Sequence, residues 1–186
     1  MFRKIDPNFP VHSFKNFFSM TDDQRDKAVM TCLRYHHKHI KRLSKLSVGY
    51  NYAVPKAGVL EEIPKKVNEA LDAAFGGKLT NDSIYAYSSN SKTSFDLWHD
   101  HAHVHTTVTT VYYLQLPNHN ESGIQFEMGD NILDYKPEQD ELVIFPGWLN
   151  HRPYKSGVSE EWRVSLNMDR IYDTPDRIFT RMGKEL

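Results

Sequence analysis

The chain has 186 residues, of which 39% are hydrophobic and 12% aromatic, and this is enough apolar material for one compact domain with its own core. A formal net charge of -1 argues against a protein that holds nucleic acid through a general basic field. The sequence contains no run of about eighteen apolar residues and no signal-peptide pattern. We therefore expect a cytoplasmic protein that spans no membrane.

Helical signals begin at Thr21. Thr21-Asp-Asp-Gln24 is typical of a capping box, and apolar residues at helical spacing after it predict a helix that extends to about Leu46. A second helix is predicted over Glu61–Phe75, with Pro64 in its first turn and Gly76-Gly77 as its stop.

Two features of the first predicted helix need an interpretation. Its C-terminal half is basic and contains His36, His37 and His39, which we interpret as solvent-exposed because they cannot all face one metal from a helix. Cys32 is the one cysteine, so an intrachain disulfide is excluded. Its position within the helical pattern predicts a buried, unreactive thiol.

Beyond Lys78 the pattern changes to short apolar and β-branched runs that are separated by Asn, Gly, Pro and Ser clusters. Several short strands after leading helices indicate an α+β domain with a β-sandwich or barrel core. The predicted strands cover residues 83–87, 95–105, 108–116, 123–128, 142–145 and 163–168.

The most informative segment carries four histidines at odd positions. In a regular strand all four side chains would lie on one face, because side chains alternate with a period of two. Such a row is consistent with metal ligands and equally with polar partners on a solvent-facing strand. The four residues are His99, His101, His103 and His105.

Two later segments favour the metal interpretation. His151 follows a strand and a Pro-Gly turn, an arrangement that aims one imidazole at a fixed point. Arg163 lies twelve positions further on, within a predicted strand with apolar neighbours. A buried guanidinium is costly without an anion, so Arg163 requires either a protein carboxylate or a bound ligand.

The order of these features resembles that of the 2-oxoglutarate and Fe(II)-dependent oxygenases, in particular the small prolyl-hydroxylase-like and the phage or bacterial branches. Members of that superfamily have a His-x-Asp/Glu pair before a strand that often contains Tyr-Tyr-Leu. A distal His follows a Gly-rich turn, and an Arg about ten residues later binds the co-substrate 2-oxoglutarate. The resemblance covers about residues 83–167, and here Tyr112-Tyr113-Leu114 supplies the strand motif.

The resemblance implies a metal site made of His101, His103 and His151, because His101-Ala-His103 has the spacing of a His-x-His variant before Tyr-Tyr-Leu. This chain has no His-x-Asp or His-x-Glu pair before the Tyr-Tyr-Leu motif. His99 is the reserve ligand, and Asp100 is an alternative if the strand bulges.

The resemblance also implies a fold, a cofactor and a co-substrate. The fold would be a double-stranded β-helix (jelly-roll) core over residues 78–170, with helical support in 1–77 buttressing one sheet and a tail over 171–186, all in a single domain. The protein would use Fe(II), 2-oxoglutarate and O2 to hydroxylate a substrate that the sequence does not identify. The residues expected to bind 2-oxoglutarate are Arg163, Tyr113 and Ser165.

Two alternatives stay open. A cupin-like three-histidine metal dioxygenase would bind metal without using 2-oxoglutarate, and Arg163 would then have no role in binding an oxoacid. A non-catalytic jelly-roll binding protein that has lost its acidic ligand would bind no stoichiometric iron.

Overall fold

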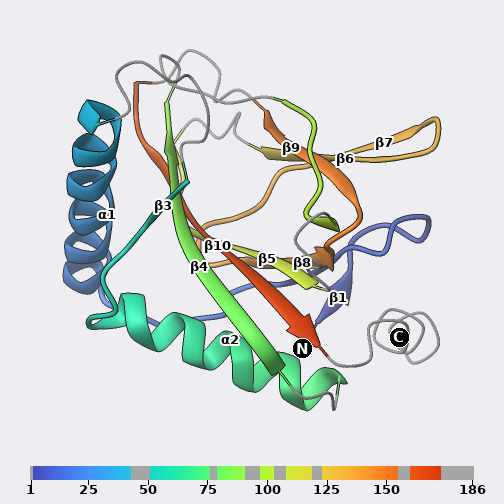
Figure 1. Cartoon of the computed structure of the whole chain (residues 1–186), viewed down its shortest axis with the longest axis horizontal. Coiled ribbons are helices and arrows are strands. Elements are labelled where there is room, and N and C mark those ends of the chain that lie inside the picture. Colours follow the sequence, from blue (N-terminus) through green and yellow to red (C-terminus); the bar gives the residue numbers. More distant parts are fainter. Residues whose placement is uncertain are drawn as a thin grey trace.

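A computed structural model describes residues 2–42, 51–75, 79–90, 97–102, 108–118, 123–154 and 160–172. Two helices and ten strands form within these ranges, and the strands pair in antiparallel fashion in two sheets. Both helices lie on one side of the larger sheet, and the smaller sheet lies toward its other side (Figure 1). The arrangement confirms the predicted mixture of leading helices and a β-rich core.

Helix α1 (Asp22–Arg42) begins at the predicted capping box. The Gln24 backbone N–H donates to Thr21 Oγ1 at 3.3 Å, and the Thr21 N–H donates to the Gln24 side chain at 2.9 Å. This reciprocal pair satisfies two donors that the helix itself cannot. Residues 43–46 of the predicted helix lie outside the described ranges.

Helix α2 (Val59–Phe75) begins two residues before its predicted start. Gly58 has a φ of +56°, and its carbonyl accepts the N–H of Glu61 at 2.9 Å. Pro64 therefore lies inside the helix and not in its first turn. Burial of the apolar face of α2 (Val59, Leu60, Ile63, Val67 and Leu71) offsets the hydrogen bond that proline removes. The predicted stop at Gly76-Gly77 lies outside the described residues.

The larger sheet contains seven strands in the order β1-β2-β8-β5-β10-β4-β3. Three of these strands come from the first 53 residues, so the N-terminal part of the chain adds sheet edges as well as helices. The strands are β1 (Arg3–Lys4), β2 (His12–Phe14), β3 (Asn51–Ala53), β4 (Leu79–Ser89), β5 (Val108–Gln115), β8 (Leu142–Pro146) and β10 (Arg163–Tyr172).

The smaller sheet has the order β7-β6-β9 and comprises β6 (Gly123–Met128), β7 (Asn131–Tyr135) and β9 (Asn150–Tyr154). An isolated bridge between His99 and His151 extends this sheet by one further segment. The strand predicted over 95–105 is described only at 97–102, where that bridge replaces a regular strand. The sequence did not predict β7 and β9.

The central strands of the larger sheet are buried on both faces, and each face contacts its own core. On β5, Tyr112 and Leu114 belong to the cluster under the helices, whereas Val111 and Tyr113 belong to the cluster between the sheets. This follows from the period-two alternation of strand side chains. The inner cluster continues into the small sheet through Phe126, and it forms the floor of the candidate site.

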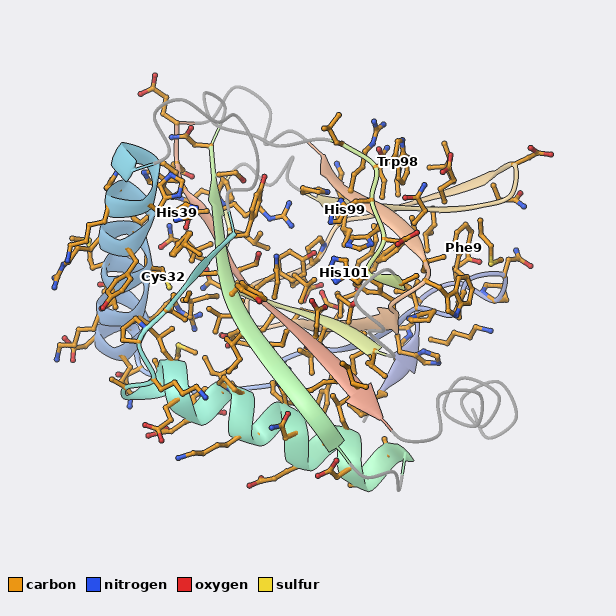
Figure 2. The ribbon with its side chains drawn as sticks, in the orientation of Figure 1. Phe9, Cys32, His39, Trp98, His99 and His101 are labelled. Atoms are coloured by element: carbon orange, nitrogen blue, oxygen red, sulfur yellow. The ribbon has the colours of Figure 1, made fainter. Side chains whose placement is uncertain are left out.

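The prediction for Cys32 is confirmed, and the prediction for His36 is wrong. Cys32 is buried, and it lies on the side of α1 that faces the sheet (Figure 2). Burial raises the pKa of its thiol to about 12. His36 is only 2% exposed and packs against Tyr52 and Trp162. The C-terminal half of α1 is basic in sequence, but helical periodicity places His36 on the face of α1 that packs against the rest of the protein.

Within the described residues, no helix is both long and apolar enough to cross a membrane.

Candidate metal centre

Three histidines from two distant parts of the chain meet between the sheets. One potential ligand atom from each of His99, His101 and His151 lies within 4.8 Å of the other two. The backbone fixes this meeting, because the His99 N–H donates to the His151 carbonyl at 3.0 Å and the His151 N–H donates to the His99 carbonyl at 2.9 Å. His101 is held nearby by its N–H, which donates to the Gly147 carbonyl at 2.8 Å.

Figure 2 shows His99 and His101 on the inner side of their segment and Trp98 on the other side. The guanidinium of Arg152 lies 4.5 Å from the centre of the Trp98 ring. Arg152 also donates from Nε to Gln125 at 2.6 Å. These outer contacts fasten the segment to the small sheet, and the alternation of side chains then directs both histidines inward.

In each of the three imidazoles, Nδ1 has an acceptor. The acceptors are the Leu97 carbonyl for His99 at 3.0 Å, the Leu149 carbonyl for His151 at 2.9 Å and the Asp169 carboxylate for His101 at 2.6 Å. An acceptor at Nδ1 fixes the proton on that nitrogen, so the lone pair is on Nε2. In each ring, Nε2 is therefore the nitrogen that would bind a cation.

Burial favours the neutral form of His99 and His151. It lowers the pKa of His151 well below its ordinary value, and the neighbouring imidazoles lower it further. Burial also lowers the pKa of His99. Metal ligation requires neutral imidazole, so the donor set fits a divalent cation that prefers nitrogen ligands. Three ligands on one side would leave other coordination positions open.

The sequence reasoning did not identify two groups beside the cluster, Asp169 and Thr109. The Thr109 hydroxyl donates to Asp169 Oδ1 at 3.0 Å, and the two residues are paired across β5 and β10. Asp169 is six residues from Arg163, so period-two alternation places both on the same face of β10. That alternation is the signal in the sequence that points to Asp169.

Arg163 is 2% exposed and lies between the sheets. Its guanidinium donates to the Gly123 carbonyl at 2.8 Å and lies over the rings of Tyr87 and Tyr113, 5.7 and 5.1 Å from their centres. In the described part of the chain Arg163 forms no ion pair, and its Nε has no hydrogen-bond partner. Of the two partners that the sequence required, a protein carboxylate is not found among these residues.

Tyr113 and Ser165, the other residues expected to bind 2-oxoglutarate, lie on the same inner surface as Arg163. Ser165 pairs with Tyr113 on one side and with Tyr87 on the other. Both predicted residues are 0% exposed. The Ser165 hydroxyl donates to the Asn167 side-chain oxygen at 3.2 Å.

Of the other two possible ligands, His103 and Asp100, only Asp100 lies in the described part of the chain. His103 lies outside the described residues, so its role stays a prediction. The carboxylate of Asp100 accepts the Ala102 N–H at 3.0 Å, and Asp100 is not among the residues whose ligand atoms gather. His99, the reserve ligand, is in the cluster.

No protein-family model matches the sequence, and no curated protein matches it. Solved structures do. A prolyl-4-hydroxylase from Pseudomonas putida superposes with a TM-score of 0.64 at 14% identity, over 90% of each chain. A prolyl hydroxylase from Trichoplax adhaerens, solved with a peptide fragment of the hypoxia inducible factor oxygen degradation domain, gives 0.58 at 13% identity, over 96% of this chain and 89% of that one.

A third similar structure is SnoK, a non-haem alpha-ketoglutarate-dependent carbocyclase from nogalamycin biosynthesis, with a TM-score of 0.57 at 8% identity over 89% of this chain and 80% of that one. Two of these structures are named as prolyl hydroxylases and the third as a carbocyclase, and all three share an architecture with this chain. The resemblance stated from the sequence is thereby confirmed for the fold: the chain has the fold of the prolyl hydroxylases and of non-haem oxygenases that depend on 2-oxoglutarate.

Proposed function

We propose that the protein is an Fe(II) and 2-oxoglutarate-dependent dioxygenase that hydroxylates a C–H bond of its substrate. The observation that carries this proposal is the meeting of His99, His101 and His151 within 4.8 Å, inside a fold of this type. The seven-stranded and three-stranded sheets with the site between them also support a double-stranded β-helix core with buttressing helices.

The proposed ligand set is His99, His101 and His151. When bound, Fe(II) would supply the activation of O2 coupled to oxidative decarboxylation of the oxoacid. The protein's own part is to hold one ring nitrogen of each of the three imidazoles close to the other two and to keep water away from the inner face. His151 serves both purposes, since it is 5% exposed and packs against Phe145 with ring centres 4.7 Å apart.

The position of Arg163 supports an oxoacid as the co-substrate. The Gly123 carbonyl, which accepts from Arg163, is three residues along β6 from Phe126, and Phe126 pairs with His151. Three residues of strand span about 10 Å. A short dicarboxylate can join a cation at the histidines to the guanidinium, and a bidentate carboxylate would occupy the donors that Arg163 leaves unused.

Tyr113 and Ser165 are proposed to line the oxoacid site beside Arg163. Their burial and their cross-strand pairing support this role. The two aromatic rings over which the guanidinium lies also hold it in place and exclude water. Removal of water strengthens an ion pair between Arg163 and the ligand carboxylate.

A three-histidine metal dioxygenase that does not use 2-oxoglutarate is the second candidate. The absence of a carboxylate from the ligand cluster of the described residues favours it. It predicts that Arg163 has no effect on oxoacid binding.

An anaerobic titration with Fe(II) and then 2-oxoglutarate tests the proposal. We expect stoichiometric iron and a weak visible charge-transfer band that saturates with the oxoacid. The His151→Ala variant is the control that should lose both signals. Iron binding with no band at any oxoacid concentration would favour the second candidate, and no stoichiometric iron would contradict both.

A further inference from the structure

The inner face of β10 carries a row of polar residues that runs from the oxoacid side to the metal side. Arg163, Ser165, Asn167 and Asp169 share this face because they alternate along one strand. Asp169 is at the histidine end of the row, where its Oδ1 accepts from His101 Nδ1 at 2.6 Å. The two side chains are 17% and 15% exposed, so the pair is largely removed from water.

The proposed metal centre has a charge that its ligands do not balance. Three neutral imidazoles contribute no negative charge to a divalent cation, and Asp100 is not in the cluster. A carboxylate that accepts the second ring N–H of a ligand histidine makes that imidazole a stronger donor and fixes its orientation. Asp169 is the carboxylate in that position.

We propose that Asp169 is the positioning residue of the metal centre. Asp169 holds the proton of His101 on Nδ1, so that Nε2 faces the cation. Its carboxylate also places a negative charge next to a ligand of the cation, although it does not bind the cation itself. This inference rests on the proposed metal site and identifies a residue that raises the affinity of that site for the metal.

Thr109 orients the carboxylate for this role. Its hydroxyl donates to the same Oδ1 atom at 3.0 Å and lies 3.3 Å from His101 Nδ1. Thr109 and Asp169 are direct cross-strand partners on β5 and β10. The carboxylate is therefore anchored by two central strands of the larger sheet, while the histidines come from the other side of the site.

The competing explanation is an ordinary ion pair that only stabilises the fold. A partly exposed pair of that kind contributes little, and its loss would lower the stability without changing the proton position on a ring or the affinity for a metal. The experiment must therefore measure both the tautomer of His101 and the affinity of the protein for a metal ion.

The test compares Asp169→Asn, which keeps an acceptor but loses the charge, with Asp169→Ala, which loses both. Asp134→Asn is the matched control, because Asp134 is exposed and bonded to Gln125 on the outer surface of the small sheet. Thr109→Val keeps the charge and removes one anchor, and it serves as the milder variant if the aspartate variants do not fold.

The first measurement is nitrogen NMR of the histidine rings in metal-free protein at pH 8. We expect His101 to carry its proton on Nδ1 in the wild type and in Asp134→Asn. In Asp169→Ala we expect a mixture of tautomers. The second measurement is anaerobic competition for Fe(II), and for Co(II), against a chromophoric chelator. Loss of this kind of partner weakens metal binding by about 10- to 100-fold, with Asp169→Ala at least as affected as Asp169→Asn.

Each outcome decides the proposal. Metal affinity within twofold of the wild type in both aspartate variants, or a His101 that is not protonated at Nδ1 in the wild type, would overturn the role of Asp169 while leaving the metal site intact. A wild-type protein that binds neither cation stoichiometrically would overturn the proposed function itself. The two failures are therefore distinguishable.

Discussion

At the scale of single residues, the sequence predicts a histidine metal site, but the local pattern cannot fix which histidines of the 99–105 segment belong to it. Period-two alternation places all the odd-numbered histidines from 99 to 105 on one face, so nothing within that segment separates one adjacent pair from the next. The separation comes from the backbone bridge between His99 and His151, which joins residues far apart in the chain. Such a contact is not visible in a local pattern.

The first prediction tests the register. Single replacement of His99, His101 or His151 by Ala should abolish stoichiometric binding of divalent metal, because each removes one of three converging donors. The matched variant is His103→Ala, which the sequence alone placed in the site. The measurement is the metal content of each variant after anaerobic loading. A His103→Ala variant without metal, together with a His99→Ala variant that binds metal, would show that the ligands are His101, His103 and His151.

The second prediction concerns Arg163. Arg163→Ala should retain iron but bind 2-oxoglutarate more weakly, because losing one partner of a desolvated charged pair costs about 2 to 5 kcal/mol. This corresponds to about thirtyfold to several-thousandfold in affinity. Titration of the chelate band measures it. Arg163→Lys, which keeps a charge but not the planar fork, should be intermediate. Unchanged oxoacid affinity in Arg163→Ala would favour the three-histidine dioxygenase.

At the scale of elements, a second polar cluster attaches α1 to the larger sheet. Arg25 donates to the Asp140 carboxylate at 2.9 and 2.6 Å and to the Leu114 carbonyl at 2.9 Å. Tyr112 donates to the same carboxylate. The sequence predicted α1 and the strand β5, which contains Tyr112 and Leu114, since capping and periodicity are local signals. It did not predict this attachment, because Asp140 is in a turn with a φ of 64°.

The third prediction follows from this cluster. Arg25→Ala should lower the free energy of unfolding by about 1.5 to 3 kcal/mol, the range for hydrogen bonds to charged groups. Denaturant unfolding measures the change. Lys27→Ala is the matched control on the same helix, because its ion pair with Asp23 is exposed at 75% and 73% and should contribute little. Equal effects of the two substitutions would show that α1 is not attached through Arg25.

At the scale of the whole molecule, the apolar runs and the order of the histidines, the Tyr-Tyr-Leu motif and Arg163 predicted the fold. They did not predict the outer strands of the small sheet. β5, β6, β8 and β10 were expected from their apolar runs, whereas β7 and β9 were not. β7 is largely exposed, and β9 contains a proline and three polar or charged residues. Their strand conformation depends on pairing with β6, a tertiary effect that overrides local preference.

The fourth prediction concerns pH. His12 and His36 are buried, and burial lowers the pKa of each from 6.5 to about 4. Between pH 6.5 and about 4 the unfolded chain therefore binds protons at these histidines and the folded protein does not. The free energy of unfolding should be greatest above pH 6.5 and fall as the pH drops toward 4. Each histidine contributes a slope of up to about 1.4 kcal/mol per pH unit.

Urea unfolding between pH 7.5 and 4.5 measures this slope, and His36→Phe should flatten it. His37→Phe is the control, because His37 is exposed on the same helix. An equally steep acid slope in His36→Phe would assign the effect to other groups.

A crystal structure of the protein grown with Co(II), with the cation located by its anomalous scattering, tests directly whether His99, His101 and His151 bind one metal ion. We expect one strong peak at about 2.1 Å from the Nε2 atoms of His99, His101 and His151, with the Asp169 carboxylate on the far side of the His101 ring. A peak bound by His103 in place of His99, or no ordered cation between the sheets, would contradict this expectation.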